Sequence, residues 1–347
     1  MRTWETLCLD VPCLLESRHG KRKVCSTGYD EGVSRYHGVV PALVTPFRAD
    51  ERIDYGAWQA LIDTHVAAGV DGLFAGGSSG EAYALDSEER AVMLRFCRQA
   101  AAGRATLYGN VGTITTRETI QLAQAAQADG VDVLVVVTPY YLHPTQAELE
   151  EHYVEICRSV RAPVLAYNFP HHGGVQLLPE TLGRIGERCE NLVGIKDSSG
   201  NLEQTVAYRT CVPGRELSVF VGNEPLILEG LRRGCVGCVA AFANVSPRLF
   251  TDFYRAFRGG RNADAERLQV LVTALAATVN LHTFPSVIKE AMRLAGRPVG
   301  LCRRPIGPMP GQASERIEAA IAALKQEGYI DEPAGGRAES LSAPARA

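Results

Sequence analysis

The chain has 347 residues, enough for one large α/β domain or for two domains of ordinary size. Its hydrophobic and charged fractions, 46% and 22%, are those of a globular protein with a sizeable core. A net charge of -3 offers no attraction to nucleic acid or to an acidic membrane surface, so we expect neither as a partner.

No apolar run reaches the ~18 residues that a transmembrane helix needs. Asp10 interrupts the apolar stretch at residues 7–15, so we expect no signal peptide. The ten cysteines are scattered, which predicts buried thiols in a reducing compartment rather than disulfides. Cys235 and Cys238 have the CxxC spacing of a redox or zinc site, but no second ligand pair accompanies them, and we expect them in the core. We therefore expect a cytoplasmic protein.

Both ends of the chain lack a folding pattern. Residues 1–36 show no sustained periodicity and are expected to form a poorly ordered extension, and residues 331–347 have the composition of a disordered tail. Between them, short apolar runs bounded by polar and Gly-rich residues predict eight strands. These runs are Gly38–Val44, Gly69–Ala75, Ala105–Val111, Val131–Val137, Pro163–Tyr167, Leu192–Lys196, Leu217–Val221 and Gly234–Ala241.

An amphipathic segment follows each apolar run, as at Tyr55–Ala68, Ser87–Ala101 and Thr116–Ala128. Asp86, Thr115 and Thr145 stand where helix N-caps are expected. Eight strand–helix units predict a (β/α)8 TIM barrel over residues 37–262; a doubly wound open sheet is the alternative. Helical stretches at 263–279, 285–295 and 314–326 predict a C-terminal helical extension over residues 263–330.

Polar residues stand where the predicted strands end, and in such a barrel the active site is built at these ends. They follow strands two, four, five, six and seven: Gly76–Glu81, Thr138–Tyr141, Tyr167–Gly174, Lys196 and Gly222–Glu224. We therefore expect hydroxyls, phenols and one amine to meet at one mouth of the barrel.

Lys196 ends a buried strand, and burial favours the neutral amine, which can attack a carbonyl and form a Schiff base. A structural ion pair with Asp197 or a nearby carboxylate is the alternative. The Gly76–Glu81 loop lacks the ending of a P-loop and suits a small carboxylate, bound by backbone N–H groups and serine hydroxyls. His171 and His172 have no third ligand in their motif, so no metal is expected.

Four motifs in this order resemble the dihydrodipicolinate synthase / N-acetylneuraminate lyase family: Gly77–Glu81, Thr138–Tyr141, Tyr167-Asn168-x-Pro170 and Gly194–Lys196. The likeness runs from about Gly38 to Gly328. It implies a Schiff-base aldolase or lyase that uses pyruvate on a (β/α)8 barrel, commonly as a homotetramer or dimer of dimers. No cofactor is implied beyond the covalent imine itself.

By this resemblance Lys196 forms the imine and Tyr167 is the general acid and base. The Gly77, Ser78 and Ser79 backbone and hydroxyls bind the pyruvate carboxylate. Ser78 or Ser79 links Tyr167 to Tyr141, which reaches a neighbouring subunit's site in many of the family's synthases. Val239 lines the pyruvate pocket.

One position departs from the family's synthases, which carry an arginine for the second substrate's carboxylate where this chain has His172. Histidine supplies neither a permanent charge nor a bidentate fork. We therefore expect an aldolase or dehydratase for a 2-keto-3-deoxy sugar acid, with His172, Asn223 and Glu224 binding its distal end. The alternatives are 4-hydroxy-tetrahydrodipicolinate synthase, acting on pyruvate and aspartate semialdehyde, and a non-catalytic barrel that binds a 2-oxo acid.

Overall fold

The computed structural model describes residues 35–330. The expected C-terminal tail, and all of the expected N-terminal extension except its last two residues, lie outside this range. Among residues 35–330, no helix combines the length and the apolarity that crossing a bilayer would require.

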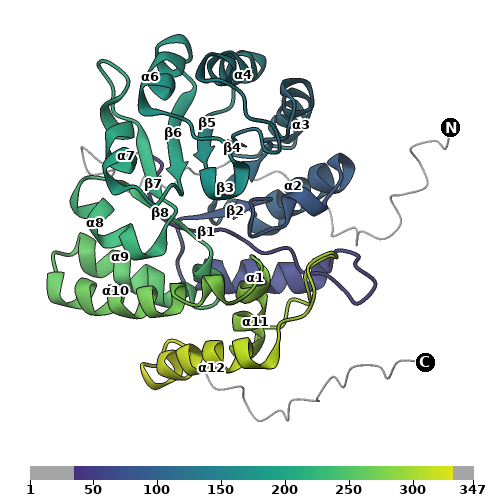
Figure 1. Cartoon of the computed structure of the whole chain (residues 1–347), viewed down its shortest axis with the longest axis vertical. Coiled ribbons are helices and arrows are strands. Elements are labelled where there is room, and N and C mark those ends of the chain that lie inside the picture. Colours follow the sequence, from purple (N-terminus) through teal and green to yellow (C-terminus); the bar gives the residue numbers. More distant parts are fainter. Residues whose placement is uncertain (1–34, 331–347) are drawn as a thin grey trace, which may run out of the picture. The chain divides into compact units, whose positions relative to one another are not determined.

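Eight parallel strands form one sheet in the order β1-β8-β7-β6-β5-β4-β3-β2 (Figure 1). Beyond the end of β1, a parallel bridge between Ala42 and Phe74 of β2 closes the sheet into a barrel. Each strand lies within a predicted apolar run or extends one residue beyond its end. The predicted (β/α)8 barrel is thereby confirmed. The strands are β1 Gly38–Pro41, β2 Gly72–Ala75, β3 Thr106–Asn110, β4 Val133–Val137, β5 Val164–Asn168, β6 Leu192–Asp197, β7 Ser218–Val221 and β8 Gly237–Ala240.

Helices surround the barrel, and three of them begin at the expected caps (Figure 1). The side chains of Asp86, Thr115 and Thr145 accept backbone N–H groups at the starts of α2, α3 and α4. Helices α5, α7 and α8 are short, with 4, 6 and 6 residues, and α7 continues directly as the 3-10 turn η3. The helices of the barrel are α1 Tyr55–Ala67, α2 Ser87–Ala101, α3 Thr116–Ala128, α4 Gln146–Ser159, α5 Pro170–Gly173, α6 Pro179–Arg188, α7 Leu202–Ala207, α8 Ile227–Arg232 and α9 Pro247–Arg258, with 3-10 turns η2 Ala82–Ala84, η3 Tyr208–Thr210, η4 Glu224–Leu226 and η5 Phe242–Asn244.

The barrel encloses its own small core. Successive side chains of a strand point to opposite faces, so alternate residues fill the interior and the others pack under the helices. The interior cluster contains aromatic residues as well as aliphatic ones: Val40, Ala42, Phe74, Tyr108, Val133, Val135, Leu165, Tyr167, Phe220 and Val239. Tyr167 is paired in register with Lys196 on the next strand, and Lys196 with Phe220, so Lys196 lies beside two members of this cluster.

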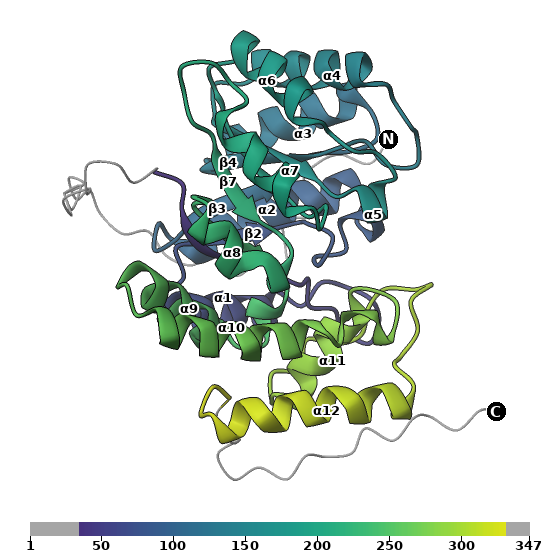
Figure 2. The same cartoon turned by 60° about the vertical axis from the view of Figure 1, so that its left-hand side comes forward.

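The C-terminal extension consists of α10 Asn262–Ala276, the 3-10 turn η6 Val279–Leu281, α11 Ser286–Leu294 and α12 Gly311–Gln326. Helices α11 and α12 lie outside the ring of barrel helices, beyond α10 (Figure 2). The expected boundary at 262/263 remains a prediction; α10 begins at Asn262.

The seven cysteines in the described range are free thiols, and all of them are buried except the half-buried Cys211. Cys238 lies in β8. Cys235 precedes this strand, because β8 is shorter than the predicted run. Cys8, Cys13 and Cys25 lie outside the described residues.

Candidate active site

Lys196 occupies the carboxyl-terminal end of β6 with its amine among aromatic rings. Its side chain is 5% exposed, and Nζ lies 4.1 Å from the ring centre of Tyr167 and 4.7 Å from that of Phe74. Burial lowers the pKa of Lys196 to about 7, although the nearby charge of Glu224 opposes this shift. A large fraction of the amine is therefore neutral, and nucleophilic, near neutral pH.

Asp197 does not pair with this amine. Its carboxylate accepts hydrogen bonds from Asn168 Nδ2 at 2.7 Å, from Ser199 Oγ at 2.7 Å and from the hydroxyl of Thr205. Adjacent residues of a strand point to opposite faces, which explains why Asp197 lies on the helix side and Lys196 inside the barrel. Within residues 35–330, Lys196 forms no ion pair. The structural ion pair considered as an alternative is thus not formed with the neighbouring aspartate.

Glu224 supplies the main charge acting on Lys196. Its Oε1 accepts the backbone N–H groups of Ala241 at 2.8 Å and Phe242 at 3.2 Å, just after β8. Burial raises the pKa of Glu224, while these hydrogen bonds and the charge of Lys196 act in the opposite direction. Asn223 lies close to Gly200, in the loop that follows β6. Neither Asn223 nor Glu224 lines the cavity described below, so their expected contact with the distal end of a substrate remains a prediction.

Tyr167 is buried within the barrel, and its hydroxyl faces a serine from another strand end. Its ring packs edge-on against Phe74, with the ring centres 5.9 Å apart. Its hydroxyl lies 3.5 Å from Ser78 Oγ. Burial raises the pKa of Tyr167, so the phenol keeps its proton at neutral pH and can donate it to a substrate.

The loop between β2 and η2 folds tightly on itself. Gly80 N–H donates to the carbonyl of Gly77 at 3.0 Å, and Glu81 N–H donates to that of Ser78 at 3.1 Å. Ser78 faces the cavity, and Ser79 is 4% exposed. The sequence left open which serine contacts Tyr167; in the structure Ser78 makes this contact.

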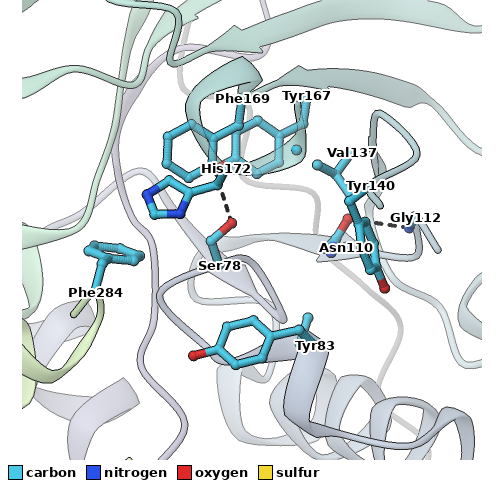
Figure 3. Close-up of a pocket in the computed structure, with 12 residues that line it drawn as sticks. Ser78, Tyr83, Asn110, Gly112, Val137, Tyr140, Tyr167, Phe169, His172 and Phe284 are labelled. Carbon is cyan, nitrogen blue, oxygen red and sulfur yellow. Dashed lines mark hydrogen bonds between the residues drawn. The ribbon is translucent and has the colours of Figure 1, made fainter. Parts of the chain in front are cut away.

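Tyr167 and Ser78 help to line a cavity of about 220 Å3 (Figure 3). Most of its wall is aromatic or aliphatic, and among residues 35–330 no lysine, arginine, aspartate or glutamate lines it. Its lining residues are Ser78, Ala82, Tyr83, Asn110, Gly112, Val137, Tyr140, Tyr167, Phe169, His172, Gly173 and Phe284. Lys196 lies beside Tyr167 and is not itself part of this wall.

Some lining residues were missed by the sequence analysis. Asn110 ends β3, and its side chain donates to the carbonyl of Gly76 at 2.7 Å; the rule of polar residues at strand ends could have found it. Phe284 precedes α11 in the C-terminal extension, and no strand-end pattern points to it. Only the folded chain brings it to the cavity.

His172 lies in an aromatic setting (Figure 3). Its ring centre is 4.4 Å from that of Phe169 and 5.7 Å from that of Phe284. Partial burial and the neighbouring His171 both lower the pKa of His172. The neutral imidazole is therefore favoured near neutral pH, and it does not replace a permanently charged arginine.

Two further predicted residues take opposite positions. Val239 belongs to the barrel's interior cluster and is not among the residues that line the cavity, so its expected place in the pyruvate pocket remains a prediction. Tyr141 has a left-handed backbone with φ 74°, and it is 87% exposed. Among the described residues, no hydrogen bond therefore completes the expected relay from Tyr141 through Ser78 to Tyr167.

Comparison with known proteins agrees with this geometry. The model of the dihydrodipicolinate synthetase family matches residues 35–324. The chain belongs to this family.

Relatives named 4-hydroxy-tetrahydrodipicolinate synthase include one from Chelativorans sp. (strain BNC1), 35% identical over 286 residues, which are 82% of this chain and 97% of the relative. One from Brucella suis is 33% identical over 294 residues, 85% of this chain and 99% of the relative. Among solved structures, YagE, a prophage protein of the same family from E. coli K12 in complex with pyruvate, superposes with a TM-score of 0.81. It is 32% identical, and the match covers 85% of this chain and 100% of YagE. The protein is thus a lyase of the class I aldolase type, and enzymes of this family use a lysine–pyruvate imine without a metal or cofactor.

Proposed function

We propose that Lys196 carries out the family's imine chemistry in this chain. Its neutral Nζ attacks the keto carbon of pyruvate, and loss of water leaves the imine. The imine withdraws electrons, so the adjacent methyl carbon loses a proton and becomes an enamine nucleophile that adds to an aldehyde. Cleavage follows the same steps in reverse. The observation that supports this role best is a buried amine between two rings with a pKa of about 7.

Tyr167 is proposed as the proton donor and acceptor for these steps, with Ser78 as its hydroxyl partner. Their 3.5 Å separation supports this pairing. The backbone N–H groups of Gly77, Ser78 and Ser79, with the serine hydroxyls, are proposed to bind the pyruvate carboxylate. Ser79 is buried and does not line the cavity. Val239, in the barrel's interior cluster, is proposed to line the pyruvate pocket.

The aldehyde partner has two candidates. The names of the curated relatives favour condensation with aspartate semialdehyde, the reaction of 4-hydroxy-tetrahydrodipicolinate synthase. The cavity wall favours a 2-keto-3-deoxy sugar acid, because in the described part of the chain it contains His172 and no lysine or arginine to bind a second carboxylate. The first candidate has the wider support among relatives, and the second rests on this chain's own residues.

Borohydride reduction in the presence of pyruvate, followed by peptide mass spectrometry, tests the imine. An adduct on Lys196 supports the proposal, and its absence would favour a barrel that only binds 2-oxo acids. Initial rates with pyruvate plus aspartate semialdehyde, compared with rates of pyruvate release from 2-keto-3-deoxy acids, then separate the two partners. A His172→Arg variant is a useful comparison, since its arginine should raise the rate with aspartate semialdehyde, which carries a second carboxylate.

We further propose a homo-oligomer, a tetramer or dimer of dimers, in the cytoplasm. The high exposure of Tyr141, together with 52% exposure of the adjacent Leu142, supports a contact with another copy at this edge of the barrel mouth. The free thiols of the described residues support a reducing compartment.

A further inference from the structure

A buried ion pair joins the loop after β2 to the C-terminal extension. Glu81 Oε1 lies 2.6 Å from Lys289 Nζ, and the two side chains are 0% and 3% exposed. Lys289 belongs to α11, outside the ring of barrel helices. Buried charges are rare unless each is compensated, so this pair links two segments that are far apart in sequence.

Further hydrogen bonds complete the link. Glu81 Oε2 accepts the backbone N–H of Arg303 at 2.9 Å, and Lys289 Nζ donates to the carbonyl of Leu301 at 2.9 Å. The guanidinium of Arg303 donates to the carbonyl of Ala84 at 2.8 Å and also pairs with Glu89. The segment after α11 is thereby attached to both ends of η2.

Glu81 also determines the shape of the loop that contains Ser78. Its φ of 54° lies in the left-handed region, which residues other than glycine rarely occupy. Its N–H donates to the carbonyl of Ser78 at 3.1 Å. An unfavourable backbone conformation persists where surrounding contacts hold it, and here the Glu81 side chain is held by α11 and Arg303.

The charge of Glu81 matters for the same loop. The proposed function assigns the pyruvate carboxylate to Gly77, Ser78 and Ser79, which precede Glu81 by only a few residues. An uncompensated carboxylate near a bound anion is repulsive, more so away from water. Lys289 supplies the compensating positive charge.

We propose that Glu81 and Lys289 are positioning residues for pyruvate: their ion pair holds the Gly77–Ser79 loop in its anion-binding shape and neutralises Glu81. This inference rests on the proposed imine chemistry at Lys196. By this inference, α11 contributes to pyruvate binding through Lys289. The same C-terminal extension also contributes Phe284 to the cavity wall.

The test titrates pyruvate against the yield of borohydride-trapped adduct on Lys196. The variants are Lys289→Met, the neutral double variant Glu81→Gln/Lys289→Met, and the control Arg293→Met. The control removes an ion pair of the same helix whose arginine is 56% exposed. We expect the pyruvate concentration that gives half of the maximal adduct yield to be about tenfold higher in Lys289→Met and at least about threefold higher in the double variant. The yield at saturating pyruvate should stay the same. The control should match the unmodified protein.

Each outcome has a distinct meaning. The proposal would be overturned if the half-saturating pyruvate concentration of both variants stays within twofold of that of the unmodified protein, even if their melting temperature falls. A shift confined to Lys289→Met would reduce the pair's role to charge neutralisation and overturn the positioning role. Where Lys289→Met fails to fold, the double variant decides, because it buries no unpaired charge. An unmodified protein that forms no adduct refutes the imine chemistry itself, independently of these variants.

Discussion

At the scale of single residues, the site depends on where the barrel puts one amine. Lys196 lies beside the rings of Tyr167 and Phe74, and Asp197 is held by other partners on the opposite face of the strand. Desolvation therefore dominates over pairing, and it shifts the pKa of Lys196 downward to about 7. Burial also raises the pKa of Tyr167. The neutral amine of Lys196 and the protonated phenol of Tyr167 therefore coexist at neutral pH.

The rate of imine formation should therefore rise with pH through a midpoint of about 7, because only the neutral amine attacks pyruvate. Rapid borohydride trapping between pH 5 and 9 measures this rate, with Lys196→Ala as the blank. A rate that still rises about tenfold per pH unit up to pH 9, as expected for the ordinary lysine pKa of about 10.4, would contradict the burial argument.

Tyr167→Phe should lower turnover by about 10²–10⁴, the usual contribution of a general acid or base. The ring remains, so packing against Phe74 and the fold should be retained, which circular dichroism can verify. An unchanged rate would remove the phenol from the mechanism.

At the scale of elements, strand ends and helix caps bring the site together. The carboxyl ends of parallel strands open on one side of the barrel, which is why Ser78, Asn110 and Tyr167 face the same cavity (Figure 3). Five of the helices around these strands, α1, α2, α3, α4 and α7, begin at side-chain caps. Two of the caps are reciprocal: Asp86 with Glu89 and Thr145 with Glu148.

Asp86→Ala should lower the free energy of unfolding by about 1 kcal/mol, within the 0.5–2 kcal/mol range of lost N-caps. The reason is that Asp86 Oδ1 accepts the N–H of Glu89 at 2.8 Å, and alanine leaves this donor to water. Urea unfolding measures the change. Gln99→Ala on the exposed face of the same helix is the control and should stay within about 0.5 kcal/mol.

At the scale of the whole molecule, a single copy lacks a closed proton relay. Among the described residues, Tyr141 forms no hydrogen bond with Tyr167 or Ser78, and it is 87% exposed with a left-handed backbone. If Tyr141 completes the site of a neighbouring copy, as the family resemblance implies, then activity belongs to the assembly.

Mixing two inactive variants tests this dependence. Lys196→Ala lacks the nucleophile, and Tyr141→Phe lacks the relay hydroxyl, so each alone should lose at least about 10²-fold in turnover. Oligomers co-expressed from both chains should regain activity, because a Tyr141→Phe copy would receive Tyr141 from its Lys196→Ala neighbour. Activity no greater than the sum of the two separate variants would place each site within a single copy.

Local patterns were sufficient to predict the barrel and the place of Lys196 at the end of a buried strand. Apolar runs and cap residues report burial and backbone hydrogen bonding over a few neighbours, so β6 with Lys196 at its end and helices α2 and α3 could be read directly. The order of the motifs likewise placed the Ser78 loop and Tyr167 at the same mouth.

Contacts between distant segments were decided only by the tertiary structure. The choice of Ser78 over Ser79 as the neighbour of Tyr167, the aromatic contacts of His172 and the pairing of Glu81 with Lys289 all depend on how separate elements meet. Periodicity carries no information about such meetings, because it records which face of an element is buried and not what it is buried against. Burial of Lys196 could be foreseen from its strand, whereas the partners that surround it required the closed barrel.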